Sequence, residues 1–157
     1  MRNGSLVMDQ NKAPIIMGCD HAAYRLKEKV KTYLVDHGIA VEDVGTHSEE
    51  SVDYPDFGIK VASQVSCGNY KRGILICGTG LGMSMVANKF ARVRAALCQD
   101  LFSAELSRRH NDANILVLGG RIIGEALALA IVQKWLEIPF DGGRHRKRLE
   151  KFDEIKK

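Results

Sequence analysis

Long hydrophobic runs are missing from this sequence of 157 residues. No apolar stretch approaches the ~20 residues that span a bilayer, and residues 1–14 lack the continuous hydrophobic segment of a signal peptide. We therefore expect no membrane partner and a cytoplasmic location. Proline is scarce, at three residues, and the hydrophobic (45%) and charged (27%) fractions are ordinary for a globular protein. This composition argues against a disordered chain or a fibre.

Cysteine is also scarce, with four residues at positions 19, 67, 77 and 98. No two of them have the CxxC spacing of a zinc ribbon, and they do not form the dense framework of a disulfide-rich secreted domain. We expect reduced, mostly buried thiols. Cys67 and Cys98 are interpreted as ordinary buried cysteines, whereas Cys19 is ambiguous.

The net charge of +4 is concentrated at one end of the chain. Residues 144–157 hold seven basic and three acidic side chains, so the remainder is neutral. A local basic tail fits a small phosphorylated ligand, or a merely solvated helix, at least as well as it fits a nucleic-acid footprint. No nucleic-acid partner is therefore expected.

Apolar, strand-like runs alternate with helical patterns along the chain. Five strands are predicted, at 14–18, 39–44, 73–77, 94–98 and 115–119. Helices are predicted from Tyr24, around Phe57 to Val65, after the glycines of 78–82, over 102–109, over 124–136 and from Arg144. This alternation implies right-handed βαβ units and a parallel sheet covered on both faces. We predict a single α/β domain over residues 14–157, a Rossmann-like three-layer α/β/α sandwich with a mostly parallel five-stranded sheet. Residues 1–13 are predicted to be a flexible N-terminal extension.

Polar residues follow two of the predicted strands. Asp20 and His21 come after the first strand, and residues 77–82 after the third. Ligands of open α/β sheets bind at the carboxyl ends of the strands, so both groups are placed for binding. His110 and Asn111 instead precede a strand. We expect them at the opposite edge, from which they could reach a site only in a neighbouring subunit.

The segment CGTGLG at 77–82 is the most informative motif. Alternate glycines between a buried strand and a helix let several N–H groups turn toward one point, which makes a nest for an anion. Met83 rules out the dinucleotide pattern, and no Gly-Lys-Ser/Thr follows as in a P-loop. A glycine loop alone is more often a simple tight turn. Cys77 shifts the balance, because a thiol beside a helix N-terminus and cations is a usable base or nucleophile.

The other candidate residues each have an ordinary alternative. The pair Asp20 and His21 suits proton transfer and phosphate contact, but such a pair is more often a helix cap with a surface histidine. His110 with Asn111 could equally be a polar turn. Arg144 and Arg148 are four residues apart, so on a helix they could grip one phosphate or simply form a solvated face.

Taken together, these motifs match one family. From residue 14 onward the chain resembles type B ribose-5-phosphate isomerase and its galactose-6-phosphate isomerase relatives, through the segments GCDHAAYRLK, VDYPD, GILICGTGLGMSMVANKF, SRRHNDANILVLGGR and GGRHRKRL. A small departure is Ala23, where relatives usually carry glycine. The resemblance implies an enzyme of the pentose phosphate pathway that interconverts ribose 5-phosphate and ribulose 5-phosphate.

The resemblance also implies roles for individual residues. Cys77 would move a proton between neighbouring carbons through a cis-enediolate, and Thr79 would assist proton movement between the two oxygens. Backbone amides would hold the oxyanion at the loop glycines Gly78, Gly80 and Gly82. Asp20 and His110 would open the furanose ring. Substrate contacts would come from His21, Tyr54, Asn111, Arg121, Arg144 and Arg148, the last three with His21 on the phosphate.

The family resemblance further implies a homodimer with shared active sites, with a tetramer of two dimers left open, and it implies no cofactor or metal. Two alternatives also stay open. One keeps the chemistry but changes the sugar to allose 6-phosphate or galactose 6-phosphate. The other is a sugar-phosphate sensor without turnover, which ranks lower because a sensor has no need for a thiol together with Asp20 and His110.

Overall fold

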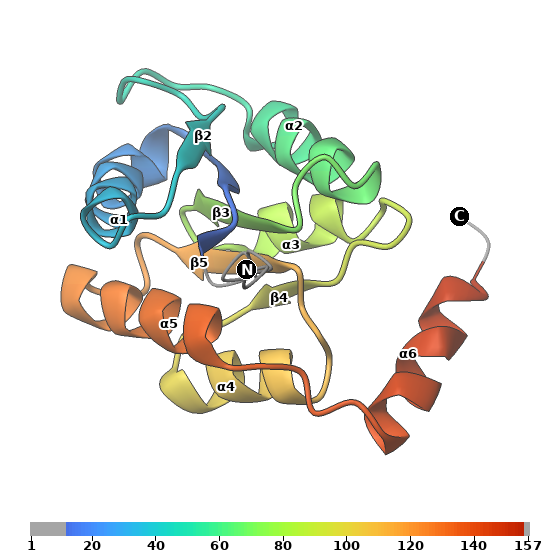
Figure 1. The fold of residues 1–157 in the computed structure, drawn as a ribbon. Helices are drawn as coiled ribbons and strands as arrows, with labels where there is room; N and C mark the ends of the chain where they lie inside the picture. Colours follow the sequence, from blue (N-terminus) through green and yellow to red (C-terminus); the bar gives the residue numbers. More distant parts are fainter. Residues whose placement is uncertain (1–11, 156–157) are drawn as a thin grey trace, which may run out of the picture.

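A computed structural model describes residues 12–155 of the chain, and the first eleven residues of the predicted N-terminal extension lie outside this range. Strands and helices alternate along the described residues (Figure 1). In chain order they are β1 (Ile15–Cys19), the short 3-10 helix η2 (His21–Ala23), α1 (Tyr24–Asp36), β2 (Val41–Asp43), α2 (Tyr54–Ser66), β3 (Arg72–Cys77), α3 (Leu81–Ala87), β4 (Ala95–Leu97), α4 (Leu101–Arg109), β5 (Ile115–Gly119), α5 (Glu125–Glu137) and α6 (Arg144–Asp153).

The five strands form one sheet in the order β2-β1-β3-β5-β4. Every neighbouring pair is parallel, which confirms the predicted Rossmann-like sandwich and makes its sheet wholly parallel. The register aligns Ile15 with Arg72 at the amino edge, and Cys77 with Gly119 at the carboxyl edge. These two edges are the reference points for the functional residues.

Two hydrophobic clusters hold the helices against the sheet. Alternate strand residues point to opposite faces, so Ile74 and Ile76 of β3 join one cluster while Leu75 and Cys77 join the other. The first cluster contains residues of α1, α4 and α5, and the second contains residues of α2 and α3. The sheet is therefore the middle layer of three (Figure 1).

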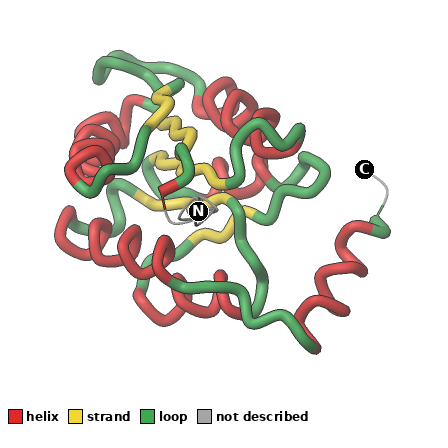
Figure 2. The backbone as a smooth tube through the Cα atoms, viewed as in Figure 1, coloured by secondary structure: helices red, strands yellow, loops and turns green. Residues whose placement is uncertain are grey.

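The observed boundaries differ most at the two edge strands. β2 and β4 have three residues each, whereas 39–44 and 94–98 were predicted. Each has only one strand neighbour in the sheet, so its flanking residues leave the ladder and enter loops (Figure 2). The prediction that Cys67 is buried was wrong. It follows the last residue of α2 and is exposed, because the chain turns outward there, whereas Cys98 is buried as predicted.

The last helix, α6, extends away from the sandwich at the end of a long connection from α5 (Figure 1). It buries His145 and Leu149, while Phe152 remains 49% exposed. Within residues 12–155, none of the helices combines the length and apolar character that crossing a membrane would require.

Candidate active site

The strand order reverses direction between β1 and β3, because β2 lies on one side of β1 and all later strands lie on the other. Such a switch point opens a crevice at the carboxyl edge, and ligands of doubly wound sheets bind there. Cys19 is aligned with Ile76 in this pair, and the N–H of Asp20 donates to the Ile76 carbonyl over 3.3 Å. The structure therefore brings Asp20 beside Cys77, as the sequence predicts.

The loop after β3 folds back over its own cysteine. The Gly80 N–H donates to Cys77 Sγ over 3.2 Å, and Gly80 has φ +79°, in the left-handed region. A Cβ on Gly80 would lie 2.5 Å from Leu97 Cδ1 and 3.1 Å from the Leu118 backbone. Only glycine fits both the conformation and the space. The Thr79 Oγ1 accepts from the N–H of Leu81, the first residue of α3, so the Thr79 hydroxyl lies near the loop backbone.

Two further predicted residues lie against this loop. The N–H of Arg121 donates to the Gly78 carbonyl over 2.9 Å, and its side chain passes close to Gly78. The ring of Tyr54, at the start of α2, packs so closely on Gly82 that a Cβ there would collide with it. Arg121, in the turn after β5, and Tyr54, at the start of α2, thus both border the loop.

His21 is oriented by the long loop between β2 and α2 (Figure 2). Its Nδ1 accepts a hydrogen bond from the Val52 N–H over 3.1 Å. In the neutral ring the proton must therefore sit on Nε2, which becomes a donor. Asp20 Oδ1 accepts from the Ala22 N–H over 3.1 Å, so one carboxylate oxygen caps η2.

Burial strongly raises the pKa of two of the cysteines, Cys19 and Cys98. Burial raises the pKa of the Cys19 thiol to about 12, and the nearby Lys27 only partly offsets this effect. Burial likewise raises the pKa of Cys98 to about 11. Raised pKa values keep both thiols protonated near neutral pH, which argues against Cys19 as a base.

The remaining predicted residues lie elsewhere. His110 directly follows α4 and precedes β5, at the amino edge of the sheet, where topology predicts it. Its ring stacks on that of His145 in α6, with centroids 4.2 Å apart and planes 9° from parallel. Asn111 is exposed beside it, and Arg144 and Arg148 are exposed on α6. Within one chain the candidate residues therefore form two groups, one at each edge of the sheet.

The amino-edge group includes three side chains that could ligate a metal ion. One ligand atom each of His110, Asp141 and His145 lies within 4.8 Å of the others. However, Asp141 already accepts from Arg109 Nε over 3.2 Å. The pKa of His145 is lowered by burial and by the neighbouring His110, Arg144 and Arg148. These cationic surroundings favour an anion over a cation.

Comparison with known proteins agrees with this geometry. A model of the ribose/galactose isomerase family matches residues 15–152. The chain belongs to this family. It is 48% identical over 136 residues to ribose-5-phosphate isomerase B of Escherichia coli, covering 87% of this chain and 91% of that protein. It is 41% identical over 138 residues to the D-erythrulose-4-phosphate isomerase of Pectobacterium atrosepticum, with the same coverage of 87% and 91%.

A solved structure supports the same relationship. The crystal structure of a ribose 5-phosphate isomerase from Thermotoga maritima superposes with a TM-score of 0.89 at 56% identity. The match covers 91% of this chain and 99% of that one. The fold of this ribose/galactose isomerase family member is thus that of an enzyme of the same family over nearly its whole length.

Sequence reasoning missed two residues that shape this family member's site. Lys27 is completely buried, and its Nζ donates to the Thr46 carbonyl over 2.8 Å, at the beginning of the loop that orients His21. His145 stacks on His110 between the two predicted arginines. Both lie inside sequence segments that carry the family resemblance. However, a lysine in a helical pattern is normally expected to be exposed to solvent, and a histidine among arginines is expected to belong to an exposed basic face. The contacts that reverse these expectations come from distant parts of the chain.

Proposed function

We propose that the chain is an aldose–ketose isomerase that interconverts ribose 5-phosphate and ribulose 5-phosphate in the non-oxidative pentose phosphate pathway. One observation carries the proposal. Cys77 ends β3 at the switch point, with its sulfur 3.2 Å from a loop N–H and Asp20 on the adjacent strand end. A thiol base, a nest of amide donors and a titratable pair suit the transfer of a proton beside a carbonyl. Membership of the ribose/galactose isomerase family supports the same chemistry.

In the proposed reaction, Cys77 as thiolate removes the proton from C2 of the open-chain aldose. The electron pair of that C–H bond forms a C1–C2 double bond, and the carbonyl oxygen becomes the oxyanion of a cis-enediolate. The N–H groups of Gly78, Gly80 and Gly82 stabilise this charge. Thr79 assists proton movement between O1 and O2. Cys77 then returns its proton to C1, which leaves the ketone at C2.

Ring opening and phosphate binding complete the proposal. Asp20 and His110 move the protons that open the furanose, while Arg144 and Arg148 bind the phosphate, together with Arg121 and His21. Asn111 and Tyr54 contact the sugar.

These roles require two subunits, so we propose a homodimer with shared active sites, with a tetramer of two dimers as a larger assembly. Three features support it. His110 and Cys77 lie at opposite edges of one sheet. α6 extends away from its own sandwich (Figure 1). A cavity of about 810 Å³, lined by Phe152 of α6, Ala95 of β4 and Asn111, leaves room for parts of a second copy.

We further propose that residues 14–157 carry the activity and that the enzyme works in the cytoplasm. The family model begins at residue 15, which supports the domain boundary. A catalytic thiol must remain reduced, and the cytoplasm keeps thiols reduced.

The decisive experiment follows conversion of ribose 5-phosphate to ribulose 5-phosphate by wild type, Cys77→Ala and Cys67→Ala. Loss of a general base costs about 10²- to 10⁴-fold in kcat, so we expect Cys77→Ala to lose at least the lower figure with little change in substrate affinity. Cys67→Ala is the matched control, because it removes an exposed thiol at the other end of α2 from Tyr54, which packs on the loop. Full turnover in Cys77→Ala would overturn the assignment of the base.

The substrate itself is tested with a panel of sugar phosphates. D-erythrulose 4-phosphate is the second candidate, because the Pectobacterium atrosepticum relative named for it is 41% identical. Allose 6-phosphate and galactose 6-phosphate complete the panel. A higher kcat/KM with any of these would replace ribose 5-phosphate as substrate. Binding of all four without turnover would favour the sensor.

A further inference from the structure

A basic pocket lies at the amino edge of the sheet, at the opposite end of the strands from Cys77. We call it the amino-edge pocket. It has a volume of about 500 Å³. Five cationic side chains line it, namely Lys71, Arg72, Arg92, Arg94 and Arg108. Its two carboxylates are Asp112 and Asp153. The lining therefore carries an excess of three positive charges.

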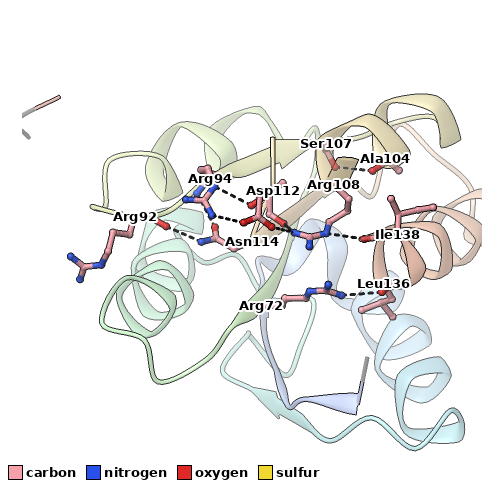
Figure 3. Close-up of polar contacts among 11 residues, drawn as sticks. Arg72, Arg92, Arg94, Ala104, Ser107, Arg108, Asp112, Asn114, Leu136 and Ile138 are labelled. Carbon is pink, nitrogen blue, oxygen red and sulfur yellow. Dashed lines mark hydrogen bonds and ion pairs between the residues drawn. The ribbon is translucent and has the colours of Figure 1, made fainter. Parts of the chain in front are cut away.

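One carboxylate serves two of these arginines. Asp112 accepts from Arg94 Nη2 over 3.2 Å and from Arg108 Nη1 over 3.0 Å (Figure 3). Arg108 is only 6% exposed and also donates to the carbonyls of Ala113 and Ile138. Arg94 and Arg108 are therefore fixed in place, and they form a rigid wall of the pocket.

Arg72 is less well compensated, because Asp112 attracts it only from beyond ion-pair distance. It begins β3, donates to the Leu136 carbonyl over 3.0 Å and stacks on the Trp135 ring, with Cζ 5.4 Å from the centroid. Among residues 12–155, neither Arg72 nor its neighbours Lys71 and Arg92 makes an ion pair with a carboxylate. Burial and the proximity of Arg108 lower the pKa of Arg72 to about 10, so it remains charged at neutral pH against an unfavourable environment.

We propose that the amino-edge pocket binds a small phosphorylated anion, at a site distinct from the carboxyl edge that carries Cys77. A phosphate offers several oxygens to guanidinium groups and supplies negative charge within direct reach of Arg72, which has only the more distant Asp112. Lys71 and Arg92 are both exposed at the rim, where they add charge, and Arg92 also donates to the Ser66 carbonyl. The pocket shares Arg92, Arg94 and Asp153 with the larger cavity beside α6, so it opens toward that cavity.

The chain carries its own reporter for this site. Trp135 is the only tryptophan, and the guanidinium groups of Arg72 and Arg108 lie 5.4 and 5.8 Å from its ring centroid. Binding of an anion to Arg72 changes the charge and position of a group stacked on this ring. Trp135 fluorescence therefore reports the amino-edge pocket rather than the carboxyl edge.

The test titrates inorganic pyrophosphate into the full-length double variant Arg144→Ser/Arg148→Ser, in which the proposed substrate phosphate site is disabled. Calorimetry measures the affinity, and Trp135 fluorescence locates the binding. We expect saturable binding at one site per chain with a fluorescence change. Adding Lys71→Ala/Arg92→Ala is expected to weaken it by about tenfold or more, since two charge-assisted contacts are lost.

The control adds Lys29→Ala/Lys60→Ala to the same parent, which removes two exposed positive charges outside the pocket and should alter the affinity less than about twofold. Absence of pyrophosphate binding in the parent, or equal losses in both variants, would overturn the proposal. Tighter binding of citrate than of pyrophosphate would overturn the phosphate assignment. In the otherwise wild-type chain, Lys71→Ala/Arg92→Ala should keep its ribose 5-phosphate turnover, so the two proposals fail independently.

Discussion

At the scale of single residues, Cys19 and Cys77 show how surroundings decide reactivity. Each ends a central strand, and the two strands are neighbours. Cys19 points into the core on the side of α1, whereas Cys77 belongs to the cluster on the side of α2 and α3. The loop that follows Cys77 turns the Gly80 N–H back onto its sulfur, whereas burial dominates the surroundings of Cys19 and outweighs its backbone hydrogen bond from Thr46.

Alkylation should separate the four thiols. With iodoacetamide at pH 8, we expect Cys67 to react first and without loss of activity, because it is exposed and outside the site. Reaction of Cys77 should follow, abolish turnover and be slowed by ribose 5-phosphate. Cys19 and Cys98 should remain unmodified in the native protein, since pKa values of about 12 and 11 keep them protonated. Mass spectrometry of peptides at successive times measures each rate, and early labelling of Cys19 would contradict this account.

Lys27 is a buried charged residue that ties α1 to Asp43 and to the loop that orients His21. Its Nζ lies 2.7 Å from Asp43 Oδ2 and 3.0 Å from Glu28 Oε1, and none of its side chain is exposed. We expect Lys27→Met to lower the free energy of unfolding by about 3 kcal/mol, because Asp43 is left buried with less compensation. Lys31→Met is the matched control. Lys31 also contacts Asp43 but is 36% exposed, so its loss should cost under about 1 kcal/mol. Urea denaturation of both variants measures the difference, and equal losses would refute the special role of Lys27.

The same pair sets a pH window for this contribution. Burial alone would raise the pKa of Asp43, but hydrogen bonds from Lys27, the Gly45 N–H and Lys31 outweigh it and lower the pKa below its ordinary 3.8. Burial opposes the charge of Lys27 too, yet bonds to Asp43 and Glu28 raise its pKa above 10.5. The stabilisation is therefore complete between these two values. It declines in acid as Asp43 is protonated and in strong alkali as Lys27 loses its proton.

At the scale of elements, the sequence predicts well those helices and strands whose position depends on a local hydrophobic pattern. The buried run GILIC and the periodic Val61 and Val65 predict β3 and α2 closely, because their apolar residues face the core in the structure. Where β2 and β4 end depends on which residues hydrogen-bond to the one neighbouring strand. A local sequence pattern does not carry that information. The exposure of Cys67 likewise depends on the turn that follows α2. The cluster of Asp20 with Cys77 was predictable because topology alone places strand ends together.

Gly80, in the loop between β3 and α3, can be compared with Gly68 to separate the effect of a steric clash from the effect of a left-handed backbone. Gly80 and Gly68 have similar positive φ values of 79° and 83°, but a Cβ on Gly68 would meet nothing within 4 Å. We expect Gly68→Ala to cost about 1 kcal/mol of stability, from the left-handed conformation alone, with normal turnover. Gly80→Ala should cost more and also lower kcat, because the added methyl group displaces the loop from Leu97 and moves the N–H that faces Cys77. Thermal unfolding and kcat of the pair measure this, and equal behaviour of the two variants would contradict it.

At the scale of the whole molecule, the division of candidate residues between two sheet edges gives the sharpest prediction. Cys77→Ala and His110→Ala should each be inactive alone. In a mixed dimer with a shared site, one site carries both substitutions and the other carries neither. Random pairing makes half of the dimers mixed, so coexpression of the two variants should restore about one quarter of wild-type activity. Differently tagged chains allow the mixed dimer to be purified and assayed. If each chain held a complete site, the mixture would stay inactive.

The outward course of α6 and the position of His110 have a consequence for how the enzyme is regulated by its own abundance. Under the shared-site proposal, a single chain holds half of each of two sites and no complete one. At concentrations below the dimer dissociation constant, the number of working sites then rises with the square of the number of chains. A twofold change in synthesis would alter flux about fourfold in that regime and only twofold above it. Under the shared-site proposal, assembly therefore makes activity depend most steeply on protein concentration when the protein is scarce.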